Sequence, residues 1–304
     1  MTVRNTCARV LAGATLGLTI AGTIAPAIAA GPLARVGSCG ARSLLGGGGR
    51  QLVFIGLTGD QRLVRFGECN PARPRDLGPI TGLTGADTAL VGIDYRVQDG
   101  LLYGVGNGGG VYRFEVPGVP AATLVNQLTV ALDPAATAFG VDFNPAADRL
   151  RIISSTGQNL RHNVNAGGTT IADGTLNYIE GTPPAPVSAT GVAAAGYTNN
   201  DLDPNTATTL FDVDGARDQV VAQSPANSGI LAATGKLAVD ADGPIGFDVY
   251  STLRDGTTIR NAGFAALHVD GAAGFYRVDV LTGVAVRIGS LGAGVVDIAA
   301  PLEQ

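Results

Sequence analysis

Short apolar runs separated by turn residues follow one another along most of the chain, and the clearest example lies between residues 138 and 164. Apolar runs at 139–143, 149–154 and 159–164 are separated by the sequences NPAAD and STGQ. Asn, Pro, Asp and Gly favour turns, and short runs bounded by such residues are typical of β-strands joined by hairpins. The stretch therefore predicts three consecutive antiparallel strands.

The same pattern begins again about every 50 residues. A glycine followed by an apolar residue marks the restarts at 91–94, 139–142, 190–193 and 245–248, and 295–298 is the equivalent segment at the end. Aligned on the residue after the glycine, the copies are 48, 51, 55 and 49 residues apart. Repeats of about 40–50 residues with four strands each are typical of β-propellers.

The two ends of the repeat region complement each other. Residues 295–300 have no hairpin of their own, whereas the first hairpin, at 52–66, has no restart strand before it. We therefore predict an all-β, five-bladed β-propeller in which the C-terminal strand completes the N-terminal blade, which removes exposed sheet edges. A β-sandwich, or a propeller with six or seven blades, is the alternative, because alternating strands and turns also fit those folds.

The composition agrees with short strands. The 304 residues include 45 Gly and 16 Pro, 45% are hydrophobic and 15% are charged, which favours many turns over long helices. The net charge of −5 gives no electrostatic reason to expect a nucleic-acid partner. We expect a monomer with an unknown extracellular ligand.

The N-terminus has the layout of an export signal. Arg4 and Arg9 precede an apolar stretch, and Ala27-Ile28-Ala29 forms an A-x-A cleavage site. We expect residues 1–29 to be a signal peptide, 30–50 to be an N-terminal extension with a Gly-rich spacer, and 51–304 to be one propeller domain. We therefore expect a bacterial protein that is secreted or extracytoplasmic. We expect no stable membrane insertion after cleavage, because no later segment is apolar enough to span a bilayer.

The signal peptide contains Cys7, so the mature chain keeps Cys39 and Cys69. Two cysteines in an exported chain predict one disulfide bond, with free thiols as the alternative. A lipid anchor on Cys39 is disfavoured, because Arg35 separates that residue from the apolar core of the signal.

Three restarts carry an aspartate, namely Asp94, Asp142 and Asp248, and Asp297 is similarly placed at the end. The first strand of a propeller blade lines the central channel, so these carboxylates could form a ring. Repetition favours a structural role in which they accept backbone N–H bonds. A ring that binds a cation or ligand is one alternative, and a glycoside hydrolase or lyase that uses two of these carboxylates as acid and base is another. The restart at 190–193, which belongs to the fourth blade, has Ala193 or Ala194 in place of the aspartate.

Two oxygen-rich stretches are weak candidates for calcium, which takes 6–8 oxygen ligands. They contain Asp201 and Asp203 in the first, and Asp212 and Asp214 in the second. Neither matches a calcium loop, so hairpin chemistry is favoured and we predict no cofactor and no metal.

A cationic group is peculiar to the third copy: Arg149, Arg151, Arg161 and His162. In an acidic protein these residues are candidates for ligand binding. The chain has only two histidines, which excludes a three-histidine zinc site, and it has no nucleophile elbow of the G-x-S-x-G type.

Two regions carry a family resemblance. The sequences GVDFNP (140–145) and AAGYTNN (194–200), the second followed by TTLFDVD (208–214), resemble a bacterial exported family known as domain of unknown function 4394. The resemblance runs from about residue 52 to residue 300. It implies a β-propeller-like domain without an assigned activity, so it assigns no functional residues. We therefore expect an exported, non-enzymatic ligand-binding or scaffolding protein at or outside the cell envelope, with the glycoside hydrolase or lyase as the alternative.

Overall fold

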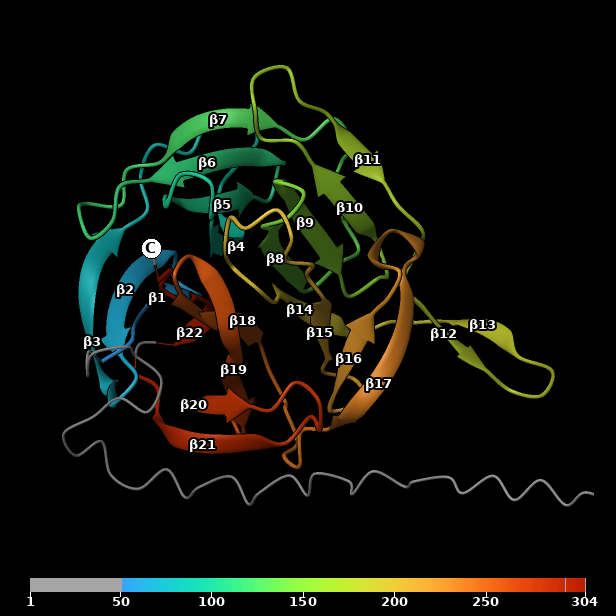
Figure 1. Cartoon of the computed structure of the whole chain (residues 1–304). Coiled ribbons are helices and arrows are strands. Elements are labelled where there is room, and N and C mark those ends of the chain that lie inside the picture. The colour runs from blue at the N-terminus through green and yellow to red at the C-terminus, as the bar shows by residue number, and fades with distance from the viewer. Residues whose placement is uncertain (1–50, 293, 304) are drawn as a thin grey trace, which may run out of the picture. The chain divides into compact units, whose positions relative to one another are not determined.

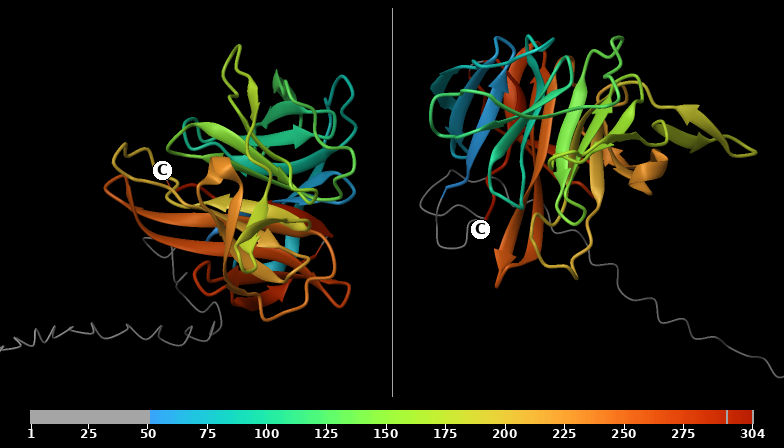
Figure 2. Two further views of the ribbon diagram at one scale, coloured as in Figure 1. Left: turned by 90° about the vertical axis from the view of Figure 1, so that its right-hand side faces the viewer. Right: turned by 90° about the horizontal axis from the view of Figure 1, so that it is seen from above.

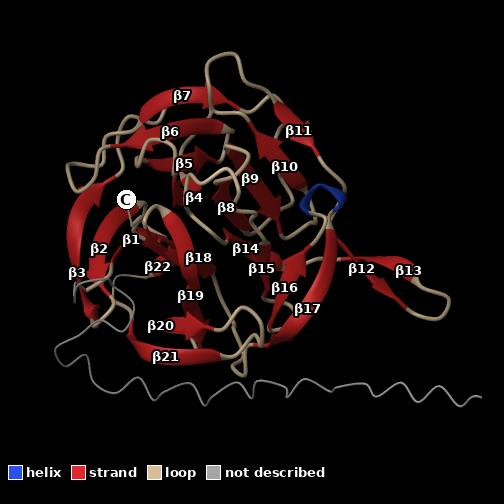
Figure 3. Cartoon of the chain, viewed as in Figure 1, coloured by secondary structure: helices blue, strands red, loops and turns tan. Residues whose placement is uncertain are grey.

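A computed structural model describes residues 51–292 and 294–303. Apart from one 3₁₀ turn, η1 (Ala226–Ser228), the regular structure of these residues is all β (Figure 3). Their strands form five sheets arranged around a common centre (Figure 1). The predicted five-bladed β-propeller is confirmed, and a sandwich or a larger propeller is excluded.

Each blade is a sheet whose innermost strand runs along the centre, and we number the blades in chain order. From inside to outside, blade 1 consists of β22 (Val295–Ala299), β1 (Val53–Thr58), β2 (Arg62–Gly67) and β3 (Asn70–Pro79). Blade 2 consists of β4 (Leu90–Tyr95), β5 (Leu102–Gly106), β6 (Gly110–Phe114) and β7 (Thr123–Gln127). Blade 3 consists of β8 (Phe139–Asn144), β9 (Arg149–Ser154), β10 (Asn159–His162) and β11 (Thr170–Ala172).

Blades 4 and 5 complete the ring. Blade 4 begins with β14 (Val192–Tyr197), β15 (Leu210–Asp214), β16 (Gln219–Gln223) and β17 (Ile230–Lys236), and continues with β12 (Asn177–Glu180) and β13 (Ala185–Ser188). Blade 5 consists of β18 (Ile245–Arg254), β19 (Thr257–Val269), β20 (Ala272–Val278) and β21 (Ala285–Ser290).

The C-terminal strand closes the ring as predicted. β22 pairs antiparallel with β1, with Ile55 opposite Ala299 and Leu57 opposite Asp297. The first and last strands of the propeller therefore share one sheet, in which β22 is the innermost strand and covers the edge of β1.

Blade 4 contains a feature that the repeat pattern does not predict. Strands β12 and β13 form a hairpin within the connection between blades 3 and 4, and this hairpin projects outward from the propeller (Figures 1 and 2). β12 pairs in parallel with β17, through Asn177 opposite Ile230 and Tyr178 opposite Leu231.

The core is divided among the junctions between blades. Five clusters of buried apolar side chains each contain residues from two neighbouring blades. Between blades 5 and 1, for example, the rings of Phe54, Phe264 and Phe275 pack with centroids 4.9–5.6 Å apart. Burial of one such side chain contributes roughly 1.5–3 kcal/mol, so apolar packing between blades holds the sheets in place.

Several predictions concern residues outside the described ranges. The signal peptide at 1–29, the extension at 30–50 and Cys39 all lie there, so export and the Cys39–Cys69 disulfide stay predictions. In the part of the chain that the structure describes, no helix has the length and apolar character needed to cross a bilayer.

Candidate functional site

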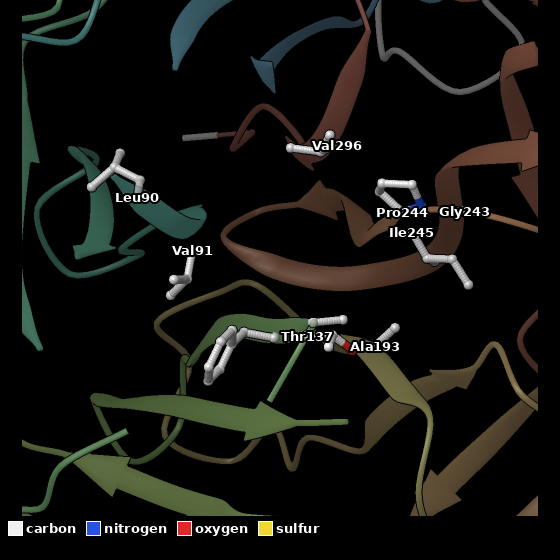
Figure 4. A pocket seen from close by; sticks show the side chains of 10 residues that line it. Leu90, Val91, Thr137, Ala193, Gly243, Pro244, Ile245 and Val296 are labelled. Atoms are coloured by element: carbon white, nitrogen blue, oxygen red, sulfur yellow. The ribbon is translucent and has the colours of Figure 1, made fainter. Parts of the chain in front are cut away.

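An apolar cavity of about 480 Å³ opens at one end of the centre of the propeller (Figure 4). We call it the funnel. Its walls come from all five blades and are lined by Leu90, Val91, Thr137, Ala138, Phe139, Ala193, Gly243, Pro244, Ile245 and Val296. Most of these residues lie at the beginning of an inner strand, so the funnel is the place where the five blades begin.

The three aspartates of the repeat lie deeper along the same strands. Asp94, Asp142 and Asp248 each follow a funnel residue by three positions, which is about 10 Å along an extended strand. They are 6%, 2% and 3% exposed, and one carboxylate oxygen of each lies within 4.8 Å of those of the others. The structure therefore brings these predicted site residues together in one buried cluster, which we call the carboxylate ring.

Each member of the carboxylate ring accepts a hydrogen bond from the backbone of the next blade. The donors and distances are Phe143 N–H to Asp94 Oδ2 at 2.7 Å, Tyr197 N–H to Asp142 Oδ1 at 2.9 Å, and Ala300 N–H to Asp248 Oδ2 at 2.6 Å. A buried backbone N–H without a partner is costly. The carboxylates therefore satisfy inner-strand donors at three of the junctions.

The same bonds identify the corresponding position in blade 4. The donor to Asp94 directly follows Asp142, and the donor to Asp142 directly follows Gly196. Gly196, rather than Ala193 or Ala194, is thus the counterpart of the aspartates, because a register shift between Val192 and Ala194 displaces the strand. A Cβ atom on Gly196 would lie 2.8 Å from the Phe247 ring, so the position has no space for a carboxylate.

Asp297 lies at a different level from the ring. The donor to Asp248 is Ala300, which makes Ala299 the counterpart in β22. Asp297 lies two residues earlier and accepts the N–H of Ile93 at 2.8 Å. The expectation that it is placed like the other aspartates is therefore wrong by two residues, although it also joins two neighbouring blades.

Burial controls the acidity of the ring. It raises the pKa of Asp94 and of Asp142 well above the ordinary value, and the neighbouring carboxylates raise both further. Burial also raises the pKa of Asp248 to about 6, against the opposing effect of its two backbone N–H donors. The ring consequently holds protons at a pH where an exposed carboxyl group has lost its own.

The four weak calcium candidates do not gather in one place. Asp201 accepts backbone N–H bonds from Asp203 at 3.0 Å and Thr258 at 2.9 Å, and Asp203 accepts the hydroxyl of Thr257 at 2.8 Å. These carboxylates therefore already serve their own loop and the neighbouring hairpin.

The second pair of candidates differs from the first. Asp214 accepts the hydroxyl of Tyr178 at 2.5 Å. Asp212 is fully buried, and neither of its oxygens has a hydrogen-bond partner among the described residues. Burial raises the pKa of Asp212 well above its ordinary value, although the charge of Arg151 opposes the shift.

The cationic group of blade 3 is divided by strand alternation. Arg151 and Arg161 are opposite each other on β9 and β10, and both pair with Asp173, at 2.8 and 3.0 Å. Arg151 is 3% exposed and also donates to Tyr197, Asn159 and Asn227. It is therefore the centre of a buried polar network between blades 3 and 4.

The other two cationic candidates make separate contacts. Arg149 donates to the backbone carbonyls of Ala147 and Asp148 at 3.2 and 2.7 Å. His162 is fully buried and its Nδ1 lies 3.0 Å from Thr170 Oγ1. Burial lowers the pKa of His162 to about 4, and the charge of Arg149 contributes to the shift, so the imidazole is neutral at pH 7.

The funnel residues were not among the candidates drawn from the sequence. Their common signal is an apolar residue near the start of each repeat, such as Val91, Phe139 and Ile245. Because buried core positions carry the same signal, the pattern alone does not distinguish a cavity wall from packed interior.

Three solved structures illustrate what this chain is similar to. A symmetrical protein studied for its de novo evolutionary emergence aligns at a TM-score of 0.47 and 14% identity, over 83% of this chain and 100% of that chain. A protein of unknown function from Bacteroides thetaiotaomicron aligns at 0.46 and 14%, over 88% and 69%. A chain of a nidogen/laminin complex aligns at 0.45 and 9%, over 84% and 100%.

No curated protein matches the sequence. A family model does match, over residues 62–299, which is most of the chain and nearly all of the propeller. The chain therefore belongs to the family described as domain of unknown function (DUF4394).

Proposed function

We propose that this protein is a non-enzymatic ligand-binding protein that acts at or outside the cell envelope and binds its ligand in the funnel. The observation that carries the proposal is the funnel itself, a cavity of about 480 Å³ to which all five blades contribute. Small-molecule sites are concave, mostly apolar and of about 300–1,000 Å³. The walls favour a neutral, largely apolar ligand, with the Thr137 hydroxyl as a polar group.

The arrangement of the carboxylates supports binding over catalysis. A glycoside hydrolase or lyase that used Asp94, Asp142 and Asp248 would need a carboxyl group that substrate reaches and that exchanges a proton with it. All three are at least nine-tenths buried and each already accepts a backbone N–H from the next blade. These bonds favour a structural role for the ring beneath the funnel.

The neutral dye Nile red is a suitable first probe, because its fluorescence rises in an apolar site. We expect saturable binding with one dye per chain, and an Ala193→Phe variant should bind at least about tenfold more weakly because the new ring fills the cavity. Val119→Ala is the matched control, since Val119 is 75% exposed and lies outside the funnel. Equal binding by the Ala193→Phe variant would overturn the assignment of the site.

Export is tested separately by mass spectrometry of the protein from the culture medium and from the cell fractions. Export predicts a mature chain that begins at Ala30, after the A-x-A sequence. An intact chain that retains residues 1–29 and remains in the cytoplasm would contradict the proposed location without affecting the funnel.

A further inference from the structure

Three arginines gather on blade 1, at the opposite end of the inner strands from the funnel. Arg65 on β2 and Arg75 on β3 are directly opposite each other in the strand register. Together with Arg73 they line a cavity of about 340 Å³, to which Gln51 and Asn70 also contribute. We call this cavity the arginine groove.

The guanidinium groups of the groove have no carboxylate partners in the described part of the chain. The ion pairs found there involve other arginines, including Arg62 of the same strand, which pairs with Asp76. Like charges directly opposite each other destabilise a sheet. The three arginines of the groove therefore repel one another, whereas the neighbouring Arg62 is neutralised by Asp76. A bound anion would relieve this repulsion.

The groove continues toward the centre of the propeller. Arg65 and Val53 also line a second cavity of about 260 Å³, together with Ile55, Tyr95 and Pro301. Tyr95 is the last residue of β4, whereas the funnel is lined by its first residues, Leu90 and Val91. The groove is therefore separate from the funnel, with a cationic outer part and a more apolar inner part.

From this arrangement we propose that the arginine groove is a second binding site, for an anionic ligand whose carboxylate, sulfate or phosphate group is held by Arg65, Arg73 and Arg75. The planar guanidinium group presents donors that match two oxygens of such an anion. The amides of Gln51 and Asn70 add neutral donors beside them. The inner cavity accommodates the less polar part of the ligand.

Inorganic phosphate is the first probe, titrated by calorimetry at low ionic strength. We expect saturable binding of one anion per chain, and the double variant Arg65→Gln/Arg75→Gln should weaken it at least about tenfold. The matched control is Arg113→Gln, because Arg113 is exposed, lies on the neighbouring blade and forms no ion pair among the described residues. The control should change the affinity less than about twofold.

Dextran sulfate is the second probe, and it distinguishes a polymeric anion from a small one. If the affinity for either probe depends on Arg65 and Arg75 but not on Arg113, the result supports the arginine groove as the binding site for that probe. Equal weakening by the control, or no binding of either probe, overturns it. Thermal unfolding without phosphate verifies the fold, since the double variant should melt no lower than the parent once the repulsion is removed. Added phosphate should then raise the melting temperature of the parent more than that of the variant.

Discussion

The two faces of blade 4 join it to its neighbours by opposite chemistry. Toward blade 3, Asp142 accepts the N–H of Tyr197, and Arg151 forms a buried polar network with Asp173. Toward blade 5, Gly196 packs against Phe247 and the shared cluster is apolar. Both junctions contain an apolar cluster, but a buried arginine network is added only toward blade 3, whereas toward blade 5 Asp201 accepts the backbone N–H of Thr258. A carboxylate near the centre is accordingly weak evidence for activity.

Small neutral groups take part in the apolar junction at its edge. The side-chain amide of Asn200 donates to the backbone carbonyl of Val249 at 2.9 Å, and its backbone N–H donates to Ser251 at 2.9 Å. These bonds satisfy backbone groups without burying a charge, which avoids the desolvation cost of an ion. The polar junction, by contrast, depends on every member of its network being present.

The largest expected difference between the two junctions comes from Arg151→Ala. Removal of this guanidinium leaves Asn159 and Asn227 without their donor and Asp173 with Arg161 alone, and because loss of the only partner of a buried charge costs about 3–5 kcal/mol, we expect a loss of up to that size. The matched change on the other face, Asn200→Ala, removes one side-chain hydrogen bond and should cost about 1 kcal/mol. Urea unfolding midpoints measure both, and equal losses would contradict the comparison.

A smaller effect is expected within the carboxylate ring. Asp142→Ala leaves the N–H of Tyr197 without its acceptor, which should cost about 1–3 kcal/mol of unfolding free energy. Asp142→Asn is the control, because an amide oxygen still accepts that bond while the charge is gone. We expect the Asn variant at pH 8 to be at least as stable as the parent. If the ring instead bound a cation, the parent would be the more stable of the two proteins when that cation is present.

Much of this architecture could be predicted from the sequence. The period of about 50 residues gives the five blades, and the incomplete first and last repeats give the ring closure through β22. The restarts also predict that Asp94, Asp142 and Asp248 lie at the same depth along the central channel, because equivalent positions on the innermost strands of repeated blades face one another. Local turn chemistry and hydrophobic periodicity are sufficient for these features.

Register shifts limited the remaining predictions. The bulge beside Val192 moves the counterpart of the aspartates to Gly196, and the shifts between β2 and β3 bring Arg65 opposite Arg75. A shift of one residue reverses the face to which every following side chain points, and single-sequence patterns do not reveal it. The cationic group around Arg149 and His162 looked continuous in the sequence, but no register shift is involved: His162 points to the opposite face from its neighbour Arg161, and Arg151 and Arg161 are paired with Asp173.

The smallest expected effect concerns Asp212, the buried carboxyl group without a hydrogen-bond partner among the described residues. Its folded-state pKa lies well above the ordinary value, so the folded protein binds its proton more tightly than the unfolded chain does. Stability from this group is therefore greatest below a pH of about 4 and is lost as the pH rises through the folded-state pKa. Asp248, with a folded pKa of about 6, loses its contribution between about pH 4 and pH 6.

The parent protein should accordingly melt at a higher temperature at pH 5 than at pH 8, against the trend of a protein whose carboxylates are ion-paired. In Asp212→Asn a neutral group of the same shape replaces the carboxyl group that titrates. The variant should gain stability relative to the parent as the pH rises from 4 to 8, measured as a difference in melting temperature between the two proteins that grows with pH. A difference that is constant with pH would show that the packing of Asp212, and not its ionisation, sets its effect on the polar junction.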